Sequence, residues 1–411
     1  MSLAWAQSPS HRRWLDAEFG RLLDFAAASA HPDGGFAWLD DQGVPDIGGP
    51  VQLWITSRMT HVFSLGHLVG RPGAGPMADH GVAALRGRFF DDAYGGWYTA
   101  VGTADASAAR KGAYEHAFVL LAAASAVAAG RPGSGVLLDQ ALAVHEDHFW
   151  RPSDGLVVDV WDRTFTDLEP YRGVNANMHA VEAYLAAADV GDAPVWRERA
   201  LRITERVVNV WARDNGWRIP EHFDESWQPR LDYNRDDPAH PFRPYGATIG
   251  HGLEWARLCL HLHGALGADA PTWLVPAAQD LFDVAVADGW CADGADGFVY
   301  TADWDGTPVV RSRLHWVVAE AIAAASALRQ ATGEDRFERR YRQWWDYAAT
   351  HLLDHAGGSW WHELDTDNQP AATVWDGKPD VYHAAQATLL PRLPLAPTLA
   401  AGLSEGRLDA L

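Results

Sequence analysis

The sequence predicts an all-α fold in which six helical hairpins form one closed ring. Three observations lead to this prediction. A short glycine-centred motif recurs six times, each copy lies between two helical patterns, and the second helix of each pair is nearly free of charge. Internal repeats of this kind are typical of solenoids and closed toroids.

The repeated motif is a glycine followed within two residues by an aromatic or β-branched residue. Its copies are centred on Gly35, Gly96, Gly155, Gly216, Gly297 and Gly358, at intervals of 61, 59, 61, 81 and 61 residues. Glycine adopts positive φ at a tight turn, and the residues after it begin an extended segment. Each copy therefore predicts a short β-hairpin, and the fourth repeat carries about twenty extra residues.

The segments before each motif are amphipathic, whereas those after it are rich in Ala and Leu, which suits an outer and an inner layer. The predicted outer helices are Arg12–Ala28, Pro76–Phe89, Val136–Phe149, Val195–Trp211, Pro271–Ala287 and Asp335–His351. The predicted inner helices are Val51–Leu68, Gly112–Ala129, Val174–Ala188, Thr248–Gly264, Leu314–Arg329 and Val381–Leu390.

The alternative arrangement of these twelve helices is an open solenoid. The terminal repeats show no polar capping face, which favours a closed ring. No linker, low-complexity stretch or block of charge divides the chain, so residues 1–411 are expected to form a single catalytic domain.

Composition excludes several classes of partner. The net charge is −21, from 54 acidic and 33 basic residues, so binding to nucleic acid or to an anionic membrane is not expected. No apolar run is long enough to span a bilayer. Two cysteines, Cys259 and Cys291, and the lack of a signal-like N-terminus indicate a cytoplasmic protein. The sequence leaves open whether it is a monomer or a homodimer. The 21 tryptophans suit a carbohydrate cleft as well as a core.

Polar and aromatic residues interrupt the apolar inner helices at similar distances from each repeat's glycine. They are Trp54 and Arg58, Tyr114 and His116, Asn175 and His179, His251 and Glu254, Trp316 and Glu320, and His383. Several pairs are three or four residues apart and so share one helix face. In a closed ring these side chains are expected to point into one central cavity.

Each of these residues also has a structural explanation when it is taken alone. A single histidine in an apolar helix is usually a core residue, and Arg58 and Glu320 are charges of opposite sign that would suit a buried ion pair. Because all six repeats contribute, a lined pocket is the better interpretation. His61, His145, His148 and His315 lack this support and are assigned structural roles.

At these positions the chain resembles the N-acylglucosamine 2-epimerase superfamily, most closely its aldose–ketose isomerase branch of mannose and sulfoquinovose isomerases. The resemblance covers Arg12 to Leu390. It rests on Thr56–His61, Tyr114–Phe118, Asn175–His179, Gly250–Trp255, His315–Val317 with Glu320, and Lys378–His383.

The resemblance implies an (α/α)6 barrel with short β-hairpins in its loops and a monosaccharide substrate. It implies that His251 and His383 are the acid/base pair. It also implies a sugar pocket lined by Arg58, Tyr114, Asn175, His179, Glu254, Trp316 and Glu320, to which Trp54 is added. Tyr233–Phe242 would cover the cavity mouth, and Arg243 would reach the substrate from there.

The implied reaction is the interconversion of D-mannose and D-fructose through a cis-enediol, with no cofactor and no metal. Histidines supply the proton transfers near pH 7. Glu254 is expected to orient His251, and Arg58 to stabilise an enediolate oxygen. A mannose/glucose 2-epimerase and a sulfoquinovose isomerase are the alternatives within the family.

Three other classes of function remain open at this point. A glycoside hydrolase would use Glu254 and Glu320 as its two carboxylates. A metal enzyme would use His179 with Glu182 and His251 with Glu254, although di-metal helices usually carry the reverse order, Glu-x-x-His. A sugar-binding protein without catalysis would leave the histidines idle.

Overall fold

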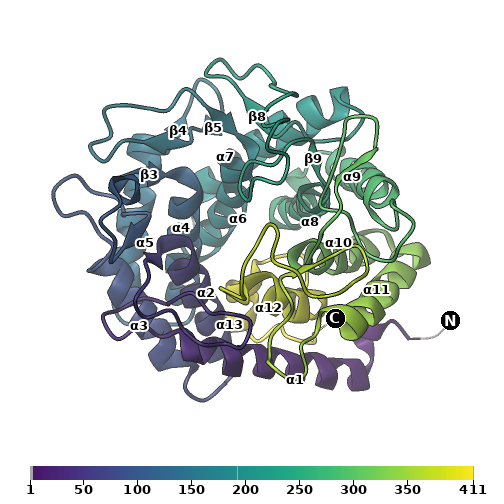
Figure 1. Ribbon diagram of the computed structural model, residues 1–411, viewed down its shortest axis with the longest axis horizontal. Coiled ribbons are helices and arrows are strands. Elements are labelled where there is room, and N and C mark those ends of the chain that lie inside the picture. Colours follow the sequence, from purple (N-terminus) through teal and green to yellow (C-terminus); the bar gives the residue numbers. More distant parts are fainter. Residues whose placement is uncertain (1–2, 192, 411) are drawn as a thin grey trace.

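The structure is a ring of helices in two concentric layers (Figure 1). A computed structural model describes residues 3–191 and 193–410. The chain runs once around the ring, so that consecutive repeats are neighbours in space and the last repeat returns to the first (Figure 1). The prediction of an all-α (α/α)6 barrel is confirmed.

Six nearly apolar helices form the inner layer. They are α2 (Leu53–Leu68), α4 (Ala113–Ala128), α6 (Val174–Gly191), α8 (Ile249–Leu266), α10 (His315–Thr332) and α12 (Tyr382–Leu389). Each contacts the next, and α12 contacts α2. The ring is therefore closed, and the open solenoid is wrong.

Six amphipathic helices form the outer layer. They are α1 (Pro9–Ala26), α3 (Ala74–Arg86), α5 (Ser134–Val144), α7 (Pro194–Thr204), α9 (Leu274–Gly289) and α11 (Asp335–Tyr347). Three of them continue as π-helical turns to Phe149, Ala212 and Leu352. In α11 the buried residues Phe337, Tyr341 and Trp344 recur at one helical face, which explains why so charged a helix packs against the ring.

Short strands tie each repeat to the next. Strands that directly precede inner helices are β1 (Val51–Gln52), β3 (Lys111–Gly112), β7 (Arg172–Gly173), β9 (Ala247–Thr248) and β12 (Arg313–Leu314). Their antiparallel partners in the following repeats are β2 (Ala100–Val101), β6 (Val160–Trp161), β8 (His222–Phe223), β10 (Thr301–Ala302) and β13 (Glu363–Leu364). This pairing fixes where each of these helices begins.

The glycine motifs form the predicted turns. All six glycines have positive φ, from 62° at Gly216 to 110° at Gly297. A bridge or strand pair closes five of the six hairpins: Ala30 with Phe36, Phe90 with Trp97, β4 (Trp150–Arg151) with β5 (Leu156–Val157), Trp290 with Phe298, and Leu353 with Trp360. β11 (Pro308–Val310) adds a third strand beside β10.

The other end of the ring is closed by the C-terminal helix. α13 (Leu399–Ser404) contacts α2, α4 and α6. The end that carries the strands is therefore the open one. Among the described residues, no helix is both long enough and apolar enough to cross a membrane.

Candidate active site

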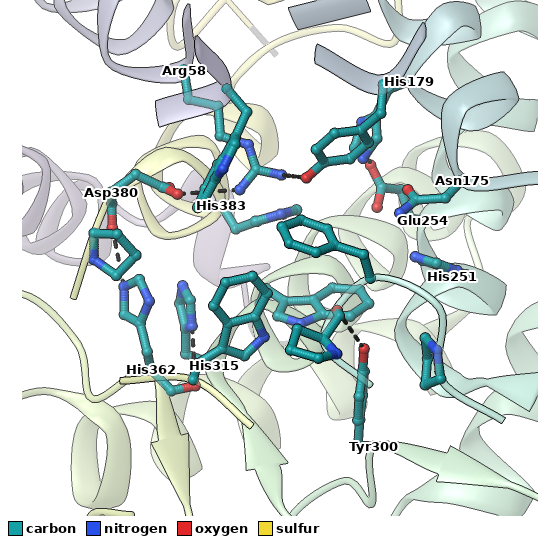
Figure 2. Close-up of a pocket in the computed structure, with 18 residues that line it drawn as sticks. Arg58, Asn175, His179, His251, Glu254, Tyr300, His315, His362, Asp380 and His383 are labelled. Carbon is teal, nitrogen blue, oxygen red and sulfur yellow. Dashed lines mark hydrogen bonds and ion pairs between the residues drawn. The ribbon is translucent and has the colours of Figure 1, made fainter. Parts of the chain in front are cut away.

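A pocket opens at the strand end of the ring, where the inner helices begin (Figure 2). Nine of the eleven predicted site residues line it: Trp54, Arg58, Tyr114, Asn175, His179, His251, Glu254, Trp316 and His383. The hairpins and loops above the helices add Pro241, Phe242, Pro244, Tyr300, His362, Trp375, Pro379 and Asp380, and His315 adds a further wall.

Eight of the ten pocket residues on the inner helices are the second or the sixth residue counted from the helix start, two positions that lie one turn apart; His315 is the first residue of its helix and His251 the third. The second residues are Trp54, Tyr114, Asn175, Gly250, Trp316 and His383. The sixth residues are Arg58, Phe118, His179, Glu254, Glu320 and Ala387. Gly250 is the one second residue that does not line the pocket. No larger residue fits there, because a Cβ would lie 2.2 Å from the Trp316 indole.

Two histidines in the pocket are each bound to a buried carboxylate. Nδ1 of His251 lies 2.9 Å from Glu221, and Nδ1 of His383 lies 2.9 Å from Glu320. A carboxylate accepts the Nδ1 hydrogen, so the Nε2 atom of each ring is the one left free for chemistry.

Trp316 packs against both of these histidines. Its ring centroid is 5.4 Å from that of His251 and 5.6 Å from that of His383. The indole offers a flat surface beside the two imidazoles, a feature suited to the C–H face of a sugar.

Arg58 provides a fixed positive charge on the pocket wall. Its guanidinium donates to Asp380 at 3.2 Å and to the Tyr114 hydroxyl at 2.9 Å (Figure 2). It also stacks over Phe118, with Cζ 4.4 Å from the ring centroid. Burial opposes its charge, but Tyr114 and Asp380 outweigh burial and raise the pKa of Arg58 above its usual value.

A buried charge network lies directly beneath the pocket, centred on Arg257. Its guanidinium lies 2.8 Å from Glu320, 3.3 Å from Glu254 and 3.8 Å from Glu182. Burial raises the pKa of Glu320, but Arg257 and His383 outweigh burial and lower it to about 2. Glu320 is therefore ionised.

The pKa of Glu254 is shifted in the opposite direction. Burial, followed by the charge of Glu320, raises it well above the usual range, and the charge of Arg257 opposes this shift without cancelling it. Of the two carboxyls, Glu254 therefore holds a proton more readily than Glu320 does. Burial lowers the pKa of His179, which lies beside Glu254, to about 4, so His179 is neutral.

Two sets of side chains in this region are close enough to hold a metal ion: His179, Glu182 and Glu254, and Glu254, Glu320 and His383. Arg257 already contacts all three carboxylates, and its guanidinium supplies positive charge where a cation would. We therefore assign neither set as a metal site.

The structure corrects four of the predictions. Glu254 does not orient His251, because Glu221 does so. Glu320 lies behind His383 and does not line the pocket. Arg243 does not reach the pocket, since it pairs with Glu169 at 2.9 Å. His315, assigned a structural role, is in the pocket wall.

His116 also lies away from the pocket. It is the fourth residue of α4 and points back toward the second hairpin, where its Nε2 accepts the Trp97 backbone N–H at 3.1 Å. The loop Tyr233–Phe242, expected to cover the mouth, does contribute to the pocket. Phe242 lines the pocket and packs against Trp54, Tyr114 and Trp375.

Glu221 is the main residue that sequence reasoning missed. It precedes β8 in the fourth hairpin, 30 residues before its partner, and is 4% exposed. The only feature of the sequence that could have identified Glu221 is that it is an acidic residue next to a strand that is otherwise buried. Asp380 and His362 were also missed. Both belong to loops, and the helical pattern does not indicate which loop residues reach into the pocket.

Comparison with known proteins agrees with this geometry. The model of the N-acylglucosamine 2-epimerase (GlcNAc 2-epimerase) family matches residues 34–387. A D-mannose isomerase of Thermobifida fusca is 56% identical over 402 residues, covering 97% of this chain and 98% of the relative. A D-mannose isomerase of Pseudomonas cannabina pv. alisalensis is 48% identical, covering 98% and 97%.

Solved structures give the same result. The crystal structure of a D-mannose isomerase superposes with a TM-score of 0.85 at 30% identity, over 93% of this chain and 97% of the other. A cellobiose 2-epimerase from Spirochaeta thermophila has a TM-score of 0.81 at 20% identity, over 97% of each chain, and so shares the fold. With a family model matched over most of its length and relatives of this identity over nearly all of it, the chain belongs to the N-acylglucosamine 2-epimerase family.

Proposed function

We propose that the protein is an aldose–ketose isomerase that interconverts D-mannose and D-fructose in this pocket. The observation that carries the proposal is the pair of His–Glu dyads whose histidines pack against Trp316. The relatives at 56% and 48% identity, both D-mannose isomerases, support this choice of substrate.

The reaction moves a proton from C2 of the open-chain aldose to C1, and a second proton between the two oxygens, through a cis-enediol. The first step needs a base that is neutral at working pH. Burial lowers the pKa of His383, with Arg58 acting in the same direction, although the hydrogen bond to Glu320 opposes them. A neutral, Nδ1-bonded imidazole accepts a proton at Nε2, and its carboxylate then stabilises the imidazolium.

We assign His251 and His383 as the acid/base pair. Arg58 stabilises the negative charge that develops on the enediolate oxygen, since it stays protonated and is held by Asp380. Glu254, which lines the pocket, hydrogen-bonds to a sugar hydroxyl. Trp54, Tyr114, Asn175, His179 and Trp316 bind the sugar.

Two predicted residues take other roles in this proposal. Glu320 acts through His383 as a positioning residue. Arg243 anchors the loop that carries Phe242, because it pairs with Glu169 and stacks 3.8 Å over the Tyr171 ring. The chain acts as one catalytic unit, since the inner helices of all six repeats contribute residues to the pocket. Free Cys259 and Cys291 fit a reducing compartment such as the cytoplasm.

A C2 epimerase is the second candidate, and one feature favours it. Epimerisation needs an acid/base group on each face of C2, and the pocket holds two His–Glu dyads. A glycoside hydrolase is disfavoured, because Glu320 does not line the pocket and both Glu254 and Glu320 are tied to Arg257.

Proton NMR of the protein with D-mannose in D2O tests the proposal. The expected result is D-fructose with deuterium at C1. D-glucose deuterated at C2, in place of fructose, would support the epimerase. No conversion of D-mannose would contradict both.

A further inference from the structure

His315 is a buried pocket histidine to which the proposed mechanism gives no task. It is the first residue of α10 and is 5% exposed. Its Nδ1 lies 3.3 Å from the backbone oxygen of His362, which also accepts the His315 backbone N–H at 3.1 Å. A carbonyl oxygen only accepts, so the ring hydrogen of His315 is on Nδ1.

The other ring nitrogen, Nε2, is therefore a hydrogen-bond acceptor. It is buried and has no partner among the described residues of the chain. Burial, and then the charge of His383, lower the pKa of His315 to about 3, so the ring stays neutral near pH 7. A buried acceptor without a partner is costly, and in a ligand pocket the usual partner is the ligand.

The direction of this lone pair is fixed by the surroundings. The His362 ring stacks on His315 with centroids 3.8 Å apart and planes 23° apart. His362 is held in turn, because its Nε2 donates to the backbone oxygen of Asp380 at 3.0 Å. Asp380 is paired with Arg58. The His315 ring thus has little freedom to turn away from the pocket.

We propose that Nε2 of His315 accepts a hydrogen bond from a sugar hydroxyl that takes no part in the reaction, at C3, C4 or C6. The inference rests on the proposed function. Figure 2 shows His315 and His251 on opposite sides of the pocket. His315 is also 6.5 Å from His383 between ring centroids, so with C1 and C2 held at the two dyads it is placed to meet a hydroxyl beyond C2.

The test compares D-mannose with its 3-, 4- and 6-deoxy derivatives as substrates of the wild type, His315→Asn and His315→Gln. Asn keeps a donor near the position of Nδ1 but has no atom at Nε2, whereas Gln can place its amide oxygen near Nε2. In the wild type one deoxy sugar should lose about 10- to 100-fold in kcat/KM relative to mannose. In His315→Asn that ratio should fall to about 1, and His315→Gln should restore part of it.

His145→Asn is the matched control. His145 is likewise buried with an Nε2 that lacks a partner among the described residues, but it does not line the pocket. It should keep the wild-type ratios for all three deoxy sugars. If His315→Asn also keeps all three, or changes all three equally, the proposed contact does not exist.

The experiment separates this inference from the proposed function. Wild-type turnover of D-mannose tests the function by itself. If the wild type converts another hexose instead, the same comparison uses the 3-, 4- and 6-deoxy derivatives of that hexose. The His315 contact is then tested by whether the kcat/KM ratio of one deoxy sugar to its parent hexose changes between the wild type and His315→Asn.

Discussion

Glu221 lies 2.9 Å from Nδ1 of His251, although 30 residues separate them and they belong to a hairpin and to a helix. Glu320 likewise lies 2.9 Å from Nδ1 of His383, from which it is separated by 63 residues. Each carboxylate selects one tautomer and stabilises the imidazolium that forms when Nε2 takes a proton. This repeated arrangement is what makes the pair of histidines suited to passing a proton in both directions.

His251→Ala and His383→Ala should each remain folded and lose about 10²- to 10⁴-fold in kcat, the usual range for a general acid or base. Fructose formation from D-mannose measures the loss, and circular dichroism checks the fold. His148→Ala is a suitable control, because His148 does not line the pocket. A tenth or more of the wild-type rate in either pocket variant would remove that histidine from the acid/base pair.

Glu320→Gln should shift the pH profile as well as lower the rate. Glu320 raises the pKa of His383 through its hydrogen bond and its charge. With Gln the pKa of His383 falls further, so the acidic limb of kcat/KM moves to lower pH and the imidazolium is less well stabilised. A purely structural role would lower the rate without moving this limb, so the pH profile decides.

Glu254→Gln should cost less stability at pH 7 than Glu320→Gln, because burial and the charge of Glu320 raise the pKa of Glu254 and so disfavour its ionised form. Glu320→Gln removes an ionised partner of Arg257 and should cost about 3 to 5 kcal/mol, as for a broken buried ion pair. Urea unfolding of the two variants provides the comparison. Equal losses would mean that both carboxyls are ionised in the native protein.

Arg58→Lys should lower kcat by about 10²- to 10³-fold, with a smaller effect on the fold. Lysine keeps the charge but cannot bridge Asp380 and the Tyr114 hydroxyl together, so the charge is misplaced relative to the enediolate. The kcat and KM of both proteins for D-mannose are the measurement. If KM alone changed, Arg58 would bind the ground state and transition state equally.

Most of the fold could be predicted from the sequence because its repeat is regular. Glycine turns at steady intervals fix six units, and helix amphipathicity separates the two layers. Much of the pocket followed from the same regularity, since eight of its residues are the second or sixth residue of an inner helix, although His251 is a third residue. His116 was misassigned because its distance from the glycine was used, whereas its place in α4, the fourth residue, decides where it points.

The rest of the site depends on contacts between repeats, which a single sequence pattern does not contain. Glu221 reaches His251 only because β8 pairs with β7, so that the fourth hairpin lies above the inner helices. Glu320 and Glu254 are each the sixth residue of an inner helix. Glu320 nevertheless lies behind the pocket wall, where it contacts Arg257 and His383. The roles of carboxylates were therefore the least predictable part of the site.

Buried neutral histidines should make the protein unstable in mild acid. Burial lowers the pKa to about 4 in each of four fully buried histidines, namely His61, His145, His179 and His261. In the unfolded chain their pKa is about 6.5. Their contribution to stability is complete above pH 6.5 and is lost as the pH falls toward 4. The free energy of unfolding should therefore decrease by up to about 1.4 kcal/mol per pH unit for each of them.

Carboxyls whose pKa is raised by burial act in the opposite direction. Burial raises the pKa of Asp159 to about 7 and also raises that of Glu115 and of Glu254, so these groups favour the folded state as the pH falls. Buried histidines with a lowered pKa outnumber these acids, and the net effect is a loss of stability below pH 6.5. His145→Asn should make the dependence shallower by about 1.4 kcal/mol per pH unit, because it removes one proton-binding group of the unfolded chain. Urea unfolding of this variant and of the wild type at pH 7, 6 and 5 measures the difference, and identical slopes would mean that His145 is not buried as a neutral ring.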